Sequence, residues 1–362
     1  MKTTIEIRGV QSARELCDAS TEIRPATKVR TGNAETFLSG HGGVAMDEFD
    51  FEPVEIFSIR DCLVLPTGAV IHPKGWVVAE TLEGSLRDNG IPENNQMTLE
   101  VNAEFNDPLY CTSKFGTFNY SVFFHEILPS IYVAGAHADR AGGFTLGYAK
   151  FFPKSRRDKF LELYSPFYAP AAAVDISSLT SLCHEALVVS AGAKRQNMRR
   201  IKQVMPDLVS EFALSLDLRS ENAPERIYIL RERKSIRELE NREQVIQWAG
   251  ENGFVCIELA DLSFSAQASF FRNASIVFAE HGAGLANLWH CRKGVRVFEV
   301  FPDKLWGRWL YRAVAALSSL DYVATAIETP KDWVWNRDAI TLPLDVLDSG
   351  LLQVERGIRV SN

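Results

Sequence analysis

SIVFAEHGAGLANLW, residues 275–289, is the stretch that decides the fold. A short apolar run is followed by Gly282 and Gly284, and apolar residues then continue at helical spacing. This order predicts a strand, a glycine turn and a short helix. Glycine permits a positive φ and a close approach of backbone N–H groups to a ligand, and a helix N-terminus suits phosphate. The turn is therefore a candidate anion site, although any strand-to-helix turn can need two glycines.

The same alternation continues on both sides of this stretch. Strands are predicted at IYIL (227–230), FVCIEL (254–259) and VRVFEV (295–300), and helices lie between them, with one more at about 304–317. Asn241 is a plausible N-cap, with Gln244 in the capping-box position, and Gly253 closes that helix. Strands that alternate with helices predict a parallel doubly wound sheet. Such sheets bind ligands beyond the carboxyl ends of their strands.

Several polar residues fall near those predicted strand ends. Arg231 and Arg233 follow the first strand, and both could clamp a diphosphate, which suits a planar guanidinium. Most of this charged run is expected to face solvent, with Arg231 as the first exception. The imidazole of His281 can donate a hydrogen bond to phosphate. Glu299 lies inside an apolar strand and needs a partner, for which a ribose hydroxyl pair and a structural salt bridge with an arginine are both reasonable.

The N-terminal half is less regular. Residues 1–55 are predicted as a loop-rich leader and 56–220 as an acceptor-side domain, followed by a nucleotide-sugar-binding domain at 221–345 and a tail at 346–362. Short β-runs are expected between residues 62 and 80. The apolar stretch 120–136 predicts a buried helix in which His125 and Glu126 are the polar exceptions.

Composition limits the class of protein. The chain has 362 residues, of which 46% are hydrophobic and 23% charged, and its formal net charge is −7. This length suits two globular domains. The negative charge argues against a general nucleic-acid binder, because phosphate backbones are held by Lys and Arg. With no secretory signal and no run of about 18 apolar residues, the expected location is cytoplasmic.

Residues of the C-terminal half resemble glycosyltransferase family 61. The resemblance covers roughly residues 62–302 and is clearest from 226 to 302, where a strand with an arginine, a second arginine, an asparagine, a glutamine, the His-Gly-Ala-Gly-Leu-x-Asn turn and a glutamate before proline follow in order. The donor-binding positions that the resemblance implies are Arg231, Arg237, Asn241, Gln267, His281, Gly282, Ala283, Gly284, Asn287 and Glu299.

The resemblance implies a GT-B fold, with two Rossmann-like domains and a central cleft. It also implies a nucleotide-sugar donor on the C-terminal domain, a glycan acceptor and inversion at the anomeric carbon. Cofactors are expected to be absent, and no metal is expected, because the helix dipole and arginine side chains stabilise the leaving diphosphate. Peripheral membrane contact is expected only if the acceptor is lipid-linked.

The segment NYSVFFHEILP, residues 119–129, is similar to the family's acceptor-side pattern. Aligned on its Asn, Tyr, Leu and Pro residues, the family's acidic position falls on Glu126, whereas Val122 stands where the family has histidine and His125 is displaced by three residues. Inverting transfer needs a general base, for which Glu126 is the first candidate and His125 the second. An imidazole bonded inside the domain and a helix-capping carboxylate are the structural alternatives.

Two other functions are consistent with the sequence. A pyruvyl or Kdo transferase would use a different donor at the same turn. A catalytically silent protein that binds a nucleotide or glycan would explain the departure at Val122.

Overall fold

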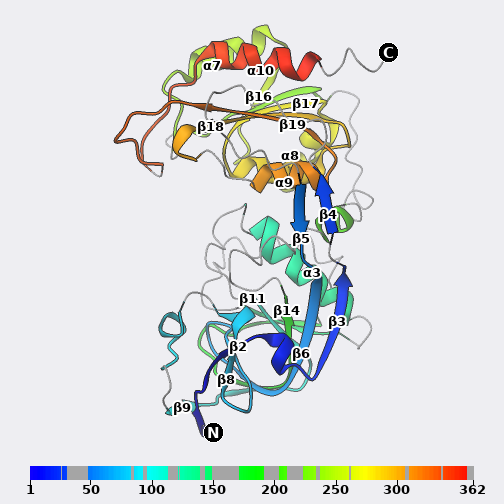
Figure 1. Cartoon of the computed structure of the whole chain (residues 1–362), viewed down its shortest axis with the longest axis vertical. Coiled ribbons are helices and arrows are strands. Elements are labelled where there is room, and N and C mark those ends of the chain that lie inside the picture. The colour runs from blue at the N-terminus through cyan, green and yellow to red at the C-terminus, as the bar shows by residue number, and fades with distance from the viewer. Residues whose placement is uncertain are drawn as a thin grey trace. The chain divides into compact units, whose positions relative to one another are not determined.

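The computed structural model describes residues 1–25, 27–30, 48–82, 85–92, 96–112, 121, 123–138, 143–148, 171–190, 204–209, 223–233, 237–260, 262–305, 310–335 and 337–356. The chain divides into two compact units (Figure 1). Unit 1 comprises Met1–Thr27 and Asp50–Phe212, and unit 2 comprises Lys28–Phe49 and Ala213–Asn362. Both units combine helices with β-sheet, which confirms the predicted α/β class.

Unit 2 is built on a five-stranded sheet in which every neighbouring pair of strands is parallel. Its strands are β15 (Arg226–Ile229), β16 (Val255–Ile257), β17 (Ile276–Glu280), β18 (Arg296–Pro302) and β19 (Asp321–Ile327). They lie in the order β16-β15-β17-β18-β19. Numbered within the sheet, this is the doubly wound order 2-1-3-4-5, whose winding direction reverses between β15 and β17.

Helices cover both faces of this sheet. The helical segments are α7 (Arg242–Glu251), α8 (Phe264–Asn273), η5 (Ala283–His290), η6 (Asp303–Leu305), α9 (Leu310–Leu317) and α10 (Leu344–Arg356). Figure 1 shows α7 and α10 on one face and α8 and α9 on the other. Phe278 of β17 packs between Phe254 and Phe298, with ring centroids 4.7 and 4.8 Å away. All five residues of β17 are buried, and the first four are apolar, as expected of a strand that is covered on both faces.

The strands and helices predicted between residues 227 and 317 are confirmed to within a few residues where the structure describes them. Gly253 adopts φ +73° just after α7, as expected for the residue that ends a helix. The side chain of Asn241 does not cap α7. It binds the backbone of Leu342 instead, donating to the carbonyl at 2.7 Å and accepting from the N–H at 2.9 Å.

Two predicted segments are corrected. Where the structure describes the predicted leader, it forms β1 (Lys2–Glu6), β2 (Gly9–Gln11), α1 (Ala13–Leu16), β3 (Ala19–Arg24), β4 (Thr27–Arg30) and β5 (Glu48–Phe51). These strands were not predicted because they pair with strands that are short or distant in sequence. For example, β1 pairs with β9 (Gln96–Glu100). The predicted tail, residues 346–362, begins inside α10, which buries Leu347, Gly350 and Val354 at helical spacing.

Unit 1 contains a mixed ten-stranded sheet. Its further elements are β6 (Val54–Val64), β7 (Val70–Ile71), β8 (Trp76–Val78), η1 (Ala79–Thr81), η2 (Arg87–Asn89), β10 (Ala103–Phe105), β11 (Leu109–Thr112), η3 (Phe123–Ile127), α3 (Leu128–Ala138), β12 (Thr145–Tyr148), β13 (Ala172–Asp175) and β14 (Ser181–Val189). The run β13-β12-β11-β14 is parallel, whereas β14, β6, β7 and β8 pair antiparallel. The predicted Rossmann-like pattern therefore extends over only part of this sheet.

Gly350 tests how closely α10 packs on the sheet. A Cβ atom at this position would lie 2.4 Å from ring carbons of Phe298 in β18. We expect Gly350→Ala to lower the free energy of unfolding by about 1–3 kcal/mol, as overpacking a core usually does. Urea denaturation monitored by circular dichroism measures this change.

Gly250→Ala in α7 is the matched control for that substitution. A Cβ atom there meets nothing within 4 Å, so the better helix propensity of alanine should raise stability by up to about 1 kcal/mol. A Gly350→Ala protein as stable as the wild type would show that α10 does not pack against Phe298 as described.

Candidate active site

The candidate site lies at the carboxyl ends of β15 and β17. Arg231 follows β15, and His281 and Gly282 follow β17. The strand order reverses between these two strands. Open doubly wound sheets bind ligands in the crevice at such a reversal, because the connections on its two sides lead to opposite faces of the sheet. The topology and the glycine turn thus identify the same edge of unit 2.

Two arginines converge on the carbonyl oxygen of His281. Arg231 donates to it through Nη2, and Arg237 does so through its own Nη2 at 3.3 Å. Arg237 is buried and has a φ of +61°, a conformation that a non-glycine residue adopts only where its surroundings stabilise it. A carbonyl oxygen carries no net charge, so both guanidinium groups keep their positive charge beside the turn.

The two glycines are required for space. Gly282 has φ −177° and ψ 172°, which is extended backbone, and Gly284 is not among the residues with positive φ. Neither glycine therefore uses the positive φ that glycine permits. A Cβ atom at Gly282 would lie 2.5 Å from Nη2 of Arg231, and one at Gly284 would lie 2.9 Å from Leu259. A side chain at position 282 would displace the Arg231 guanidinium from the turn.

His281 is held by a buried carboxylate. Its Nδ1 lies 2.5 Å from Oε1 of Glu299, whose other oxygen accepts a hydrogen bond from the hydroxyl of Tyr322. Glu299 is fully buried in β18, and its partners among the described residues are His281 and Tyr322, not the arginine considered from sequence. The Glu299 carboxylate favours a proton on Nδ1. This leaves Nε2, for which the described residues supply no hydrogen-bond partner, as the ring atom that can meet a ligand.

Aromatic rings fix the plane of this imidazole. The His281 ring stacks on Phe301 with centroids 4.6 Å apart, and it lies 5.5 Å from the ring of Tyr311 at a steeper angle. Burial, reinforced by the charge of Glu299, raises the pKa of Tyr322 well above its usual value. Tyr322 therefore remains a hydrogen-bond donor to Glu299. Tyr322 was missed in the sequence analysis, because only its hydrogen bond to Glu299 on the neighbouring strand identifies this residue as part of the site.

A second carboxylate, Glu280, lies buried at the end of β17. Tyr228 of β15 donates a hydrogen bond to its Oε1, and Oε2 has no hydrogen-bond partner among the described residues. Burial raises the pKa of Glu280, and the bond from Tyr228 and the charge of Arg231 offset this effect only in part. Burial likewise lowers the pKa of Arg231, and the charge of Glu280 opposes that shift.

Three predicted donor-binding residues hold the protein around the turn. Gln267 donates from Nε2 to the carbonyls of Leu259 at 2.9 Å and Leu262 at 3.2 Å. Asn287, which is fully buried, donates to Oε1 of Gln267 at 3.1 Å and to the carbonyl of Gly284 at 3.2 Å. Gln267 and Asn287 thus fix the position of η5 against α8. The third residue, Asn241, binds the backbone of Leu342 as described above.

Asn241 also lines a pocket of about 540 Å³ beside the first turn of α7. The pocket is lined by Arg233, Glu238, Leu239, Glu240, Asn241, Arg242, Glu243, Gln244 and Ala339. Arg233 is exposed and forms an ion pair with Glu243 at 2.5 Å, in line with the prediction that most of this charged run faces solvent. Charges of both signs line the pocket, so it has no general preference for an anion.

The predicted catalytic residues lie in unit 1. His125 and Glu126 belong to η3, a π-helical turn that precedes α3. Such turns are often found at functional sites. His125 is only 1% exposed and meets the ring of Phe124 edge-on at 6.1 Å. Val122 and the side chain of Glu126 lie outside the described residues, so the assignment of Glu126 as general base stays a prediction.

A model of the glycosyltransferase 61 family matches residues 120–298. The chain belongs to glycosyltransferase family 61. The protein is therefore a glycosyltransferase, and the matched region extends from η3 of unit 1 through the glycine turn of unit 2.

Comparisons of the whole family 61 chain add less. No curated protein matches its sequence. Among solved structures it is similar to the dodecameric iron-containing heptosyltransferase TibC in complex with ADP-D-β-D-heptose, at 10% identity over 98% of this chain and 96% of that one, with a TM-score of 0.38. It is also similar to the glycosyltransferase TibC from enterotoxigenic E. coli H10407, at 10% identity over 94% of each chain, with a TM-score of 0.37. These scores do not establish a shared domain arrangement.

Two further observations concern the ranges that the structure describes. None of the helices in those ranges combines the length and the apolar character needed to span a bilayer. Within the same ranges, no three His, Cys, Asp or Glu side chains are grouped so that they could hold a metal ion.

Glu280 gives a pH-dependent prediction. Its pKa is raised in the folded protein, so folding favours the protonated form. That contribution is complete at a pH below the unfolded-state pKa and is lost as the pH rises through the folded-state pKa. Glu280→Gln cannot ionise, yet it keeps an acceptor for Tyr228. We expect the Tm of this variant, relative to the wild type, to rise as the pH increases from about 4, the ordinary pKa of a glutamate, through the raised pKa of Glu280 in the folded protein.

The control for this measurement is Glu251→Gln, which changes an exposed carboxylate at the end of α7. Its Tm difference from the wild type should vary much less over the same pH range. An equal trend in both variants would mean that Glu280 is not buried as described.

Proposed function

We propose that this family 61 enzyme transfers a sugar from a nucleoside-diphosphate sugar to a hydroxyl of a glycan or polysaccharide precursor, with inversion at the anomeric carbon. The observation that carries the proposal is the convergence of Arg231 and Arg237 on the His281 carbonyl, where the strand order reverses. A diphosphate beside this turn would meet two guanidinium groups and the backbone N–H groups at the start of η5.

Charge is the main support for a diphosphate donor. Guanidinium groups match phosphate oxygens geometrically and remain protonated at neutral pH. When the bond between the anomeric carbon of the sugar and the diphosphate oxygen breaks, negative charge accumulates on the leaving diphosphate. Fixed positive groups stabilise that charge. We therefore propose that Arg231 and Arg237 take the part that a divalent metal plays elsewhere, so that catalysis needs no metal.

His281 would contribute a further donor. With the proton of Nδ1 directed at Glu299, a protonated Nε2 can donate to a phosphate oxygen. Glu299 and Tyr322 then act as positioning residues, because they set the orientation of the His281 ring without facing the ligand. This differs from direct ribose binding by Glu299, whose carboxylate is fully buried.

The acceptor hydroxyl needs a general base. We propose a GT-B type enzyme in which unit 2 holds the donor and unit 1 supplies Glu126 as this base. The side chain of His125, the second candidate, is buried at 1% exposure. The π-helical turn that carries both residues supports a functional role for η3.

Nucleotide binding tests the donor site. A thermal-shift screen with UDP, GDP, CMP and their common sugars, repeated with EDTA, should show a metal-independent stabilisation by one nucleotide. A ligand at 100 times its Kd stabilises the fold by about 2.7 kcal/mol. Arg231→Ala should lose most of this shift, with an affinity reduced at least tenfold. Arg233→Ala is the matched control, because Arg233 is exposed and forms an ion pair with Glu243 at the surface, and it should behave as the wild type.

The outcome of this screen also separates the rival functions. A shift confined to CMP or its Kdo conjugate would favour Kdo transfer. No shift with any nucleotide, or an equal loss in Arg231→Ala and Arg233→Ala, would reject the donor site as proposed.

Turnover tests the general base. Glu126→Gln removes the base but retains the size of the side chain, so kcat should fall by about 10²–10⁴-fold while the affinity for the nucleotide stays within twofold. Single-turnover assays with the donor found in the screen measure the first quantity, and titration calorimetry measures the second. Unchanged turnover would refute the assignment, and a wild-type protein that binds the nucleotide but shows no turnover would favour a silent binding protein.

A further inference from the structure

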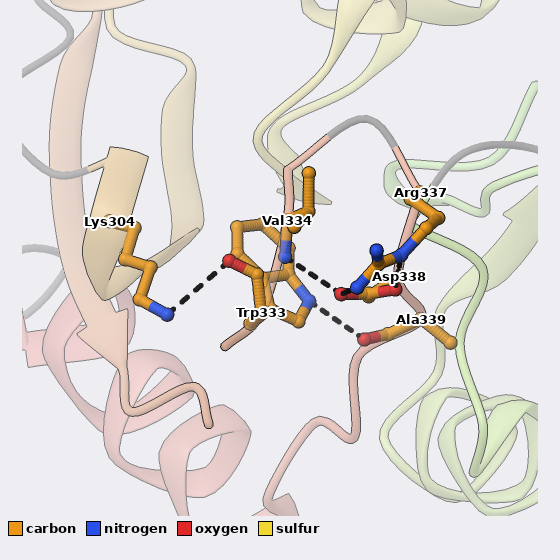
Figure 2. Close-up of polar contacts among 6 residues, drawn as sticks. All are labelled: Lys304, Trp333, Val334, Arg337, Asp338 and Ala339. Atoms are coloured by element: carbon orange, nitrogen blue, oxygen red, sulfur yellow. Dashed lines mark hydrogen bonds and ion pairs between the residues drawn. The ribbon is translucent and has the colours of Figure 1, made fainter. Parts of the chain in front are cut away.

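The loop between β19 and α10, residues 328–343, begins at the carboxyl edge of the unit 2 sheet and is tied down by Lys304. Lys304 follows β18 in η6, and its Nζ donates to the carbonyls of Pro330, Lys331 and Trp333, the last two at 2.8 and 3.3 Å. The contact with Trp333 is drawn in Figure 2. The Lys304 ammonium group thus donates all three of its hydrogen bonds to backbone carbonyls, which hold the first part of the loop in place.

The second part of the loop is held by Trp333 and Asp338. The indole of Trp333 is buried, and its Nε1 donates to the carbonyl of Ala339 at 2.9 Å. The carboxylate of Asp338 accepts from the N–H of Val334 at 2.7 Å and from Arg337 at 2.5 and 2.8 Å (Figure 2). The hydrogen bond from Arg337 is the main cause that lowers the pKa of Asp338, so the carboxylate remains charged at neutral pH.

Between these anchors the loop exposes apolar side chains. Val334 is 36% exposed and Trp335 is 45% exposed, in a segment whose backbone is fixed by its neighbours on both sides. Fixed loops that present large apolar side chains are typical of binding sites, because the order needed for recognition is already present in the free protein. The indole of Trp335 offers a flat surface of that kind.

Arg237 links Trp335 to the glycine turn. Its Nη1 donates to the carbonyl of Trp335 at 3.2 Å, while its Nη2 donates to the carbonyl of His281 at 3.3 Å. The guanidinium carbon also lies 5.9 Å from the centroid of the Trp335 ring. A single guanidinium group therefore separates the exposed indole from the candidate diphosphate site.

We propose that the Trp335 indole is the surface on which the nucleobase of the donor stacks. This inference rests on the proposed function, because it assumes that the diphosphate binds at the His281 turn. Every nucleobase has a π-face. Stacking of that face on an aromatic side chain therefore contributes to affinity whichever base is present, without recognition of its hydrogen-bonding groups. Arg237 would then contact the diphosphate and hold Trp335 at the same time.

The base, and not the sugar, is the part of the donor that this surface fits. The transferred sugar must reach the acceptor and the general base, which we assign to unit 1. The nucleoside has no such requirement and can be held entirely by unit 2, to which Trp335, Arg237 and His281 all belong. A rigid aromatic surface would orient the nucleoside and leave the sugar end unobstructed.

Titration calorimetry with full-length protein tests the inference. The probes are whichever of UDP, GDP and CMP stabilises the wild type, and inorganic pyrophosphate, which lacks a base. Trp335→Ala should lower the affinity for the nucleotide roughly tenfold or more, consistent with the loss of one base–aromatic stack. The same substitution should change the affinity for pyrophosphate less than twofold. Trp335→Phe should restore most of the nucleotide affinity. Val334→Ala, which removes the neighbouring exposed side chain, should match the wild type.

Several results would overturn the inference. Unchanged nucleotide affinity in Trp335→Ala would exclude stacking, and an equal loss for pyrophosphate would show that Trp335 acts only through Arg237. A matching loss in Val334→Ala would assign the effect to the loop and not to the ring, and a change confined to the acceptor KM would indicate sugar binding. If the wild type bound none of the three nucleotides, the proposed function itself would fail, which is a different result from loss in the variant alone.

Discussion

The carbonyl oxygen of His281 is the atom on which the carboxyl edge of unit 2 depends. It accepts hydrogen bonds from Arg231 and Arg237, which both lie in the connection between β15 and α7. Only a glycine at position 282 leaves room for the Arg231 guanidinium. A neutral acceptor orients both cations without cancelling their charge, as a carboxylate would. Both guanidinium groups thus keep a positive charge that can interact with a bound anion.

Two buried carboxylates flank this arrangement and differ in their surroundings. Glu299 has partners for both oxygens, an imidazole and a phenol, and so its burial orders the ring of His281. Glu280 has one phenol partner, and burial raises its pKa. The difference follows from position, because Glu299 lies between two strands that each supply a polar side chain, whereas Glu280 ends its strand. Similar residues at one edge therefore differ in their effect, because Glu299 orients the His281 ring whereas the raised pKa of Glu280 makes stability depend on pH.

Local patterns predicted what local interactions determine. The alternation from 227 to 317 gave the strands, helices and glycine turn of unit 2, since each element depends on its own apolar spacing. Partners distant in sequence could not be predicted. Asn241 binds Leu342, about a hundred residues away, and so does not cap its own helix. Tyr322 and Trp335 lie beyond the family motifs and gain meaning only through Glu299 and Arg237. The motif residues Gln267 and Asn287 contact protein groups, and their role in donor binding stays a prediction.

The path of the chain through the two units has a consequence for synthesis. Lys28–Phe49 belongs to unit 2, although Met1–Thr27 before it and Asp50–Phe212 after it belong to unit 1. During translation this early segment is made long before residues 213–362, which contain the sheet of unit 2. Neither unit corresponds to one uninterrupted piece of the gene. A single cut in the gene therefore cannot separate the two units, and exchange of donor-binding halves between relatives would have to carry both pieces.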